Sequence, residues 1–398
     1  MQLRPSAILA ILVFLFAAPS FSQVKEFQSK NKKALKNFTE GKKHYEKKED
    51  DKAIGFLEKS ISADPQFIDP HILLGAIYYD RKDFSSAVDY FKKAIAINPK
   101  YSSTNYYSLG SAYLKQGKYA EALPAYKALL TFGRLHPDLE KLARRDLANC
   151  EFGANALKNP VNFNPINLGP NINTEEYEYF PALTADEQTL LFTRNTRASI
   201  YDIATGSQED FFISYKVDGN WEPSQNMGPP INTPRNEGAP TLSADGQILV
   251  FTACEDRSGD YGSGREGYGR CDLFFSKKVG NNWSRPQNLG APVNSPSWES
   301  QPSFAADGKA LYFISDRKGG LGDADIWMSE LGDNGRWGNP VNLGPNINSP
   351  GKEESIFIHP DNQTLYFASN GHVGMGGVDI YMSRKDADGN WGPAQNLG

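Results

Sequence analysis

The hydrophobic pattern changes character near residue 157 of the 398-residue chain. Before that point, apolar residues recur at three- and four-residue spacing, as on one face of a helix. Small residues return at a longer period, with Gly41, Gly75 and Gly110 separated by 34 and 35 residues. A fixed period of this length is typical of stacked helical repeats. We therefore predict three consecutive helix pairs in the first half.

The middle repeat explains why particular residue types recur. Gly75 and Ala87 are small, as expected where the two helices of a pair cross closely. Tyr78 and Phe91 are large enough to fill the space between neighbouring repeats. Pro99 cannot continue a helix and therefore ends the unit.

These residues resemble the signature of the tetratricopeptide repeat, at that family's offsets. The third unit departs from the signature, because Arg134 stands where the family has proline and Pro137 follows late. Residues 138–156 continue at helical spacing, and we interpret them as a capping helix that covers the last apolar face. The predicted tetratricopeptide domain spans residues 23–157.

The resemblance also implies a concave groove that binds a protein or peptide. Aromatic side chains beside lysines suit a peptide ligand, although some of these residues would only pack the groove wall. Family geometry places the following side chains on the inner face: Lys42, Tyr45, Ile72, Tyr79, Tyr107 and Lys115.

The second half follows a different repeat. The tripeptide Asn-Leu-Gly recurs, with a methionine variant, and marks five successive positions along the chain. A Pro-x-Ile-Asn or similar segment follows, then an acidic residue, two short strands around an Asp-Gly type turn, a third strand and a tryptophan. The tripeptides end at Gly169, Gly228, Gly290, Gly344 and Gly398, and the tryptophans are Trp221, Trp283, Trp337 and Trp391.

Short strands at even spacing, with a recurring turn and a recurring aromatic residue, indicate a β-propeller. We expect hydrophobic strands at residues 189–192, 248–251, 310–313 and 364–367, buried between blades, with each tryptophan packed on its own blade. The prediction is an α plus all-β multidomain chain, in which a helical solenoid is followed by a linker at residues 158–166 and by propeller blades at residues 167–398.

The blades resemble the WD-repeat-like blades of the TolB propeller and of the OmpA family of Bacteroidetes envelope proteins, whose PorE-like members belong to the type IX secretion apparatus. The order of signal, helical repeats and blades is similar to that family. The resemblance implies a C-terminal OmpA-like domain that binds peptidoglycan, which does not appear in this sequence. We expect that the four blades are an incomplete set and that the chain is a fragment; a complete four-bladed propeller is the alternative.

The charge distribution supports two domains and excludes one class of partner. Residues 23–157 carry a net charge of +6 and residues 160–398 a net charge of −13. An acidic second half argues against nucleic acid as a partner. A run of lysines near residue 30 is interpreted as a solvated helix face, with a membrane-surface contact as the minor alternative.

The first residues look like a targeting segment. Arg4 precedes a short apolar run at residues 8–18, and small residues at Ser20 and Ser22 suit a cleavage site. We predict a signal peptide at residues 1–22 and export to the periplasm, with outer-membrane association implied only by the resemblance. No later segment has about 18 consecutive apolar residues, the length a spanning helix needs.

Export to an oxidising compartment bears on the three cysteines. Cys254 and Cys271 flank a loop in the second half, and we predict a disulfide between them. Cys150 lies in a helical stretch and is expected to be buried and reduced. The alternative is that all three are small core residues.

Sequence motifs give little indication of catalysis, metal binding or cofactor binding. Residues 262–267 match a dinucleotide fingerprint but stand between strands, so we expect a flexible insertion and no cofactor. Asp316, Asp323 and Asp325 surround glycines, and calcium is conceivable there. However, Asp325 recurs as Asp272 and Asp379, which favours a structural role in each blade. We predict no metal site.

We therefore expect a non-enzymatic envelope scaffold or adaptor that binds protein partners through the helical groove and the propeller. It would reach peptidoglycan only through a missing C-terminal domain. Two alternatives remain: a gating propeller fragment of a prolyl-oligopeptidase-like peptidase, and a free TolB-like periplasmic adaptor.

Overall fold

The computed structural model describes residues 29–197 and 207–398. The chain divides into two compact units, a helical one that ends at Pro160 and a β-rich one that begins at Val161. The four residues Val373–Gly376 group with the helical unit. The predicted signal peptide at residues 1–22 lies outside the described residues. In the part of the chain that is described, no helix is long and apolar enough to cross a membrane.

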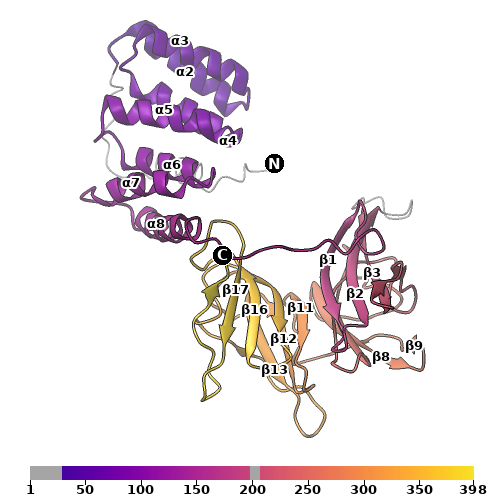
Figure 1. The fold of residues 1–398 in the computed structure, drawn as a ribbon. Coiled ribbons are helices and arrows are strands. Elements are labelled where there is room, and N and C mark those ends of the chain that lie inside the picture. The colour runs from indigo at the N-terminus through magenta and orange to yellow at the C-terminus, as the bar shows by residue number, and fades with distance from the viewer. Residues whose placement is uncertain (1–28, 198–206) are drawn as a thin grey trace. The chain divides into compact units, whose positions relative to one another are not determined.

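Three helix pairs and one longer helix follow one another in the described part of the first unit, in agreement with the predicted helical repeats (Figure 1). The cap predicted at residues 138–156 corresponds to the last helix. The bounds are α2 (Lys32–Glu46), α3 (Asp50–Ala63), α4 (Ile68–Asp80), α5 (Phe84–Ile97), α6 (Ser103–Leu114), α7 (Tyr119–Leu130) and α8 (Pro137–Ala156).

The recurring glycines lie where the paired helices touch. A Cβ atom added to Gly75 would lie 2.6 Å from the ring of Phe91, and one added to Gly110 would lie 2.8 Å from the ring of Tyr126. Contacts this short are not tolerated in packed interiors. The close helix crossing that the sequence predicted is therefore present in the second and third pairs.

The β-rich unit is arranged as a four-bladed propeller (Figure 1). Each blade is an antiparallel sheet with three long strands and a two-residue last strand, and blades one and two add a short hairpin strand, β4 or β9. Blade one contains β1 (Tyr177–Leu183), β2 (Thr189–Arg197), β3 (Ser207–Val217), β4 (Asn220–Trp221) and β5 (Gln225–Asn226); blade two contains β6 (Glu237–Leu242), β7 (Ile248–Cys254), β8 (Cys271–Val279), β9 (Asn282–Trp283) and β10 (Gln287–Asn288); blade three contains β11 (Glu299–Phe304), β12 (Ala310–Ser315), β13 (Asp325–Glu330) and β14 (Val341–Asn342); blade four contains β15 (Glu353–Ile358), β16 (Thr364–Ser369), β17 (Asp379–Arg384) and β18 (Gln395–Asn396).

Successive blades pack through their sheet faces. We call the face toward the following blade the front face and the opposite one the rear face. Between blades one and two, the front-face residues Leu191 and Phe211 share one core with the rear-face residues Leu249 and Phe251. The same arrangement joins blades two and three, and blades three and four. Each strand alternates its side chains between the two faces, so both faces of an internal blade are apolar.

Each repeated tryptophan pairs with a residue at the end of the third strand of its own blade, in agreement with the prediction. Trp337 contacts Phe304 of its own blade, with ring centroids 6.2 Å apart. Trp391 pairs with Lys385 of blade four, and its ring also lies 6.2 Å from the ring of Tyr312 of blade three.

The propeller is open on one side. The first strands of blades one and two, two and three, and three and four are in contact. Among the described residues, no strand of blade four makes more than marginal contact with a strand of blade one. The two end blades therefore each leave one sheet face without a neighbouring blade.

Candidate functional site

The residues that the sequence placed in a binding groove lie on, or directly after, the first helix of each repeat. These helices form one layer, because α2 contacts α4, α4 contacts α6 and α6 contacts α8. We call it the inner helical layer. The predicted residues are distributed as follows: Lys42 and Tyr45 on α2, Ile72 and Tyr79 on α4, Tyr107 on α6, and Lys115 at the C-terminal cap of α6.

The tyrosines of this layer bond to the next repeat. The Tyr45 hydroxyl donates to a carboxylate oxygen of Asp80 at 3.2 Å. The Tyr79 hydroxyl lies 2.9 Å from the Ser111 hydroxyl on the following first helix. Both rings remain half-buried, so one edge of each ring is accessible while its polar end is fixed. These bonds hold successive inner helices in register.

Tyr107 packs the wall of the layer, a role that the sequence left open for some of these residues. Its side chain is buried, and its hydroxyl donates to Asp146 on α8 at 2.9 Å. Asp146 also accepts from Tyr126, at 3.4 Å, and from Arg145, at 2.9 Å. Burial, followed by the nearby Asp146 charge, raises the pKa of both tyrosine hydroxyls. Tyr107 is thus part of the wall and is not accessible to a ligand.

The accessible part of the inner layer is basic and partly apolar. The Lys42 side chain is 57% exposed and lies 4.0 Å from Glu46, a distance and exposure at which an ion pair contributes little. Lys115 is also exposed, and Ile72 is half-buried. The layer therefore offers two exposed lysines and partly exposed apolar side chains, which suit an acidic or carboxylate-bearing peptide.

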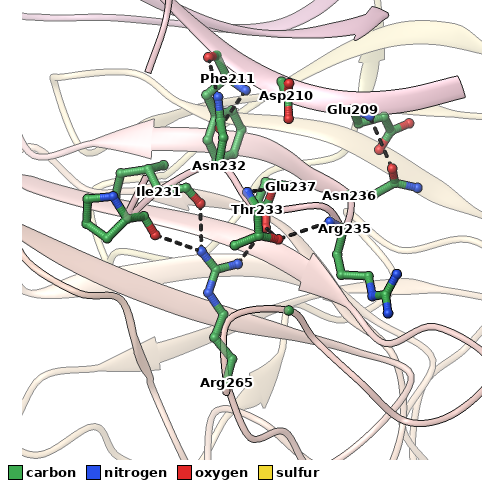
Figure 2. Close-up of polar contacts among 12 residues, drawn as sticks. Glu209, Asp210, Phe211, Ile231, Asn232, Thr233, Arg235, Asn236, Glu237 and Arg265 are labelled. Atoms are coloured by element: carbon green, nitrogen blue, oxygen red, sulfur yellow. Dashed lines mark hydrogen bonds and ion pairs between the residues drawn. The ribbon is translucent and has the colours of Figure 1, made fainter. Parts of the chain in front are cut away.

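The junction between blades one and two contains a second polar site, which sequence reasoning missed. The side-chain amide of Asn232 forms two hydrogen bonds with the main chain of Phe211 on β3, accepting at 3.0 Å and donating at 2.9 Å (Figure 2). A further bond links the blades, because the Glu209 N–H donates to Asn236 at 3.1 Å. The segment that begins blade two is thus anchored to the third strand of blade one.

A buried ion pair fixes the same segment to its own blade. Arg265 lies 2.6 Å from Glu237 and also donates to the carbonyl oxygen of Ile231 at 2.6 Å (Figure 2). Glu237 accepts two further bonds from the amide and hydroxyl of Thr233. Burial raises the pKa of the Glu237 carboxyl to about 7, while Arg265 and Thr233 act in the opposite direction.

The same arrangement recurs in the other blades. Blade one pairs Arg194 with Glu178 at 2.8 Å, and blade three pairs Arg317 with Glu299 at 3.0 Å. Each arginine also donates to a carbonyl oxygen of the segment that precedes its blade and lies over aromatic rings of the second and third strands.

Blade four has a histidine in the arginine position. The Nε2 atom of His372 lies 2.7 Å from the carbonyl oxygen of Ile347, and its ring lies 5.1 Å from the Tyr381 ring. Glu353, the matching carboxylate, is fully buried and bonds to Ser349 and Ser369. Its Oε2 atom has no hydrogen-bond partner among the described residues. Burial raises the pKa of Glu353, with the serine hydroxyls and His372 opposing.

The loop with the dinucleotide-like sequence is anchored, where a flexible insertion was expected. Arg265 belongs to this loop, and the buried pair with Glu237 fixes it. The predicted disulfide between Cys254 and Cys271 closes the same loop and joins paired positions of β7 and β8. Cys150 is a free, buried thiol, and burial raises its pKa to about 12.

The repeated aspartates have structural partners. Asp325 accepts from the Gly322 amide at 3.0 Å and from the Asn342 side chain at 2.8 Å. Asp272 accepts from the Tyr268 amide and from Asn288 in the same way. Within residues 29–197 and 207–398, no group of three or more histidine, cysteine or acidic side chains is arranged to hold a metal ion.

Comparison with known proteins supports the helical repeats. Family descriptions of the tetratricopeptide repeat match residues 68–101 and residues 90–123. Similar solved structures include the N-terminal domain of stress-induced protein-1 from C. elegans, with 24% identity, 28% of this chain and 93% of that chain covered, and a TM-score of 0.27. The first tetratricopeptide domain of Spaghetti (RPAP3), bound to an HSP90 peptide, has 24% identity, covers 33% and 99%, and has a TM-score of 0.28.

A plant protein gives a comparable likeness. The tetratricopeptide domain of Arabidopsis OM64 has 20% identity, covers 30% of this chain and 97% of that chain, and has a TM-score of 0.28. No curated protein matches the chain. The tetratricopeptide assignment therefore rests on the two family matches at residues 68–101 and 90–123.

Proposed function

We propose that the protein is a non-enzymatic scaffold of the cell envelope that holds a protein partner on its inner helical layer. The observation that carries the proposal is the combination of accessible lysines, Lys42 and Lys115, with half-buried apolar and aromatic side chains on one layer of tetratricopeptide repeats. Repeat layers of this kind present an extended surface that suits a peptide or a helix.

The charge of the helical half favours an acidic partner. Residues 23–157 carry a net charge of +6, whereas the propeller half is acidic. A carboxylate-rich segment would be attracted to the lysines, and an apolar side chain beside it would contact Ile72 and Tyr79. The interaction would weaken as the ionic strength rises, because exposed charges are screened by salt.

The envelope location rests on the N-terminal sequence pattern and on the resemblance to OmpA-family envelope proteins. A signal peptide at residues 1–22 would deliver the chain to the periplasm, where the Cys254–Cys271 disulfide would persist. A role in an outer-membrane, type IX secretion-like assembly follows from that resemblance. Cell fractionation, together with mass spectrometry of the N-terminus, tests this location: a mature chain that begins at Gln23 is expected, and a cytoplasmic chain that retains residues 1–22 would contradict it.

The experiment that tests partner binding uses charge reversal on the inner layer. The full chain and its Lys42→Glu, Lys115→Glu double variant are compared as baits in envelope extracts. The matched control is Lys52→Glu, Lys127→Glu, because these lysines are equally exposed but lie on α3 and α7, outside the inner layer. A protein retained by the wild type and the control but lost by the first variant supports the proposal. Equal retention by all three, or no retained protein, would contradict it.

A further inference from the structure

The open side of the propeller forms a second interaction surface. It is separate from the inner helical layer on which the proposed function rests. Each closed junction between blades has the same three parts. A front face packs on a rear face, a two-residue last strand completes the sheet of the preceding blade, and an asparagine bonds to the third strand of that blade. The asparagines are Asn232, Asn294 and Asn348, which bond to Phe211, Leu273 and Ile326.

The front face of blade four is partly exposed among the described residues. Ile380 on β17 is 58% exposed, whereas the residues at the same position in blades one to three are fully buried. Those three residues, Phe211, Leu273 and Ile326, are covered by the rear face of the next blade. Phe357, which neighbours Tyr366 on the same blade, is 51% exposed. The exposed residues are thus those that a following blade would cover.

The rear face of blade one lacks a preceding blade in the same way. A cavity of about 430 Å³ opens there, and its apolar lining includes Ile172, Leu190 and Phe192. In blades two to four, the corresponding rear-face residues pack against the front face of the preceding blade. Residues 165–168 form one wall of the cavity and are exposed.

Residues 165–168 match the sequence that forms the last strand of each blade, but in the structure they belong to no sheet. In blades one to four the two residues that end in the asparagine of Asn-Leu-Gly or Asn-Met-Gly form the last strand, as Gln225 and Asn226 do against β3. Ile166 and Asn167 occupy the same place before Gly169, but they pair with no strand of the described residues. The turn is nevertheless formed, since the Gly169 N–H donates to Asn167 as the Gly228 N–H donates to Asn226.

The corresponding asparagine of this first segment, Asn173, has no third strand of a preceding blade to bond to among the described residues. Asn173 stands where Asn232 stands in the next repeat. Its side-chain oxygen accepts from the Leu168 N–H at 3.2 Å, within its own segment. The segment at residues 165–173 therefore carries every part of a junction except the preceding blade.

We propose that the open side binds a fifth blade, which is a three-stranded antiparallel sheet of this same repeat supplied by a polypeptide segment other than the four blades described. Its third strand takes Ile166–Asn167 as the last strand and is held by Asn173. Its front face fills the cavity over Leu190 and Phe192, and its rear face covers Ile380 and Phe357.

A second copy of the chain fits this site less well. Each of the four blades already has a last strand, β5, β10, β14 or β18, on its third strand. A second copy therefore has no third strand free to accept Ile166–Asn167. The occupant must therefore be a three-stranded sheet that has no last strand of its own.

The test appends such a sheet to the full chain. A second copy of residues 291–340, which contains the three strands of blade three but not β14, is fused after Gly398. Hydrogen exchange at the amides of residues 166–168 is compared with that in the unextended chain. We expect exchange to be at least about tenfold slower in the extended chain. Unchanged exchange at these amides, whether or not the added strands are protected, would overturn the proposal.

A substitution gives an independent readout. Ile380→Lys should lower the melting temperature of the extended chain but leave that of the unextended chain nearly unchanged, because Ile380 becomes buried only in the former. Val279→Lys is the matched control, since Val279 is 66% exposed at a hairpin of blade two and should be neutral in both chains. An equal effect of Ile380→Lys in the two chains would overturn the proposal. So would a stable dimer of the unextended chain with protected amides at residues 166–168, because the occupant would then be a second copy.

Discussion

The side chain of Asn232 bonds to both main-chain groups of Phe211, in the neighbouring blade. It occupies the place that a residue of an additional strand would take, accepting from the N–H and donating to the C=O. Asn232 also donates to the Asn226 side chain at 2.8 Å, which fixes its orientation. One buried amide group therefore connects two sheets that share no long strand ladder.

Asn232→Ala should destabilise the propeller, because the Phe211 N–H loses its partner and the Phe211 carbonyl oxygen keeps only the bond from the Met227 N–H. A buried group without a partner costs about 1–3 kcal/mol, so we expect a loss of roughly 1–3 kcal/mol in the free energy of unfolding. All six tryptophans lie in the second half of the chain, so urea unfolding followed by tryptophan fluorescence reports on the propeller.

Asn173→Ala is the matched control for this variant. Asn173 stands at the same repeat position but bonds only within its own segment. Its removal should change the unfolding free energy by less than about 0.5 kcal/mol. Equal losses in the two variants would show that the bonds to Phe211 are not what stabilises the junction.

Arg265→Met should destabilise blade two strongly. The substitution leaves Glu237 buried without its positive partner, and breaking a buried ion pair in this way costs about 3–5 kcal/mol. Arg270→Met is the control, because Arg270 pairs with Asp316 while its side chain remains 68% exposed, and such pairs contribute about 0–1 kcal/mol. Chemical denaturation of the two variants separates these cases, and similar midpoints would contradict the assignment.

The buried carboxylate of blade four should make stability depend on pH. Burial raises the folded-state pKa of Glu353 above 4.5, its value when unfolded. Since the folded protein then holds this proton more tightly, folding is weakened as the pH rises through 4.5 and the raised pKa. Melting temperatures of the wild type should therefore fall relative to those of Glu353→Gln over this range.

His372→Arg tests the cause of that dependence. A guanidinium stays charged throughout this pH range. The variant should reduce the loss of stability at higher pH, because it supplies the permanent cation found in the other three blades. Parallel melting curves for the wild type and this variant would argue against a role for residue 372 in balancing Glu353.

Two glycine substitutions in the helical unit should have opposite signs. Gly75→Ala places a Cβ 2.6 Å from the Phe91 ring, and overpacking of this kind costs about 1–3 kcal/mol. Gly55→Ala on α3 meets no atom within 4 Å, so the better helix propensity of alanine should stabilise the unit by up to about 1 kcal/mol. Thermal unfolding followed by far-UV circular dichroism distinguishes the two, and stabilisation by both would refute the close crossing.

Reduction of the Cys254–Cys271 disulfide should lower stability without loss of the blade. The bond closes a loop with a sequence separation of 17, for which chain entropy predicts about 3 kcal/mol. Unfolding of the Cys254→Ala, Cys271→Ala variant, measured by tryptophan fluorescence, checks this value. Cys150→Ala provides a comparison that leaves the disulfide intact.

Elements defined by a fixed period could be predicted from the sequence. The capping helix was expected at residues 138–156 and is found at Pro137–Ala156. The second strand of every blade begins where the apolar run begins, as at Thr189 and Thr364. These features are visible because the residues that form them are neighbours in the chain and repeat at constant distances.

The arginine partners were missed because their position is not periodic. Arg194 follows its glutamate Glu178 by 16 residues, while Arg265 follows Glu237 by 28. Loops of different length bring the guanidinium to the same place, so no offset in the sequence reveals it. The bond of Tyr107 could not be predicted for a related reason, since its partner Asp146 lies 39 residues further on in a helix outside the repeat pattern.

The asparagine bond between blades has a consequence for how the gene could change. The 54-residue unit ending at Gly344 carries the last strand of blade three, and the unit after it carries Asn348, which bonds to the third strand of that blade. A tandem duplication of one unit would therefore insert a blade together with both of its joints. Unequal recombination can lengthen or shorten such an array in single steps, with no coordinated substitutions at the neighbouring blades.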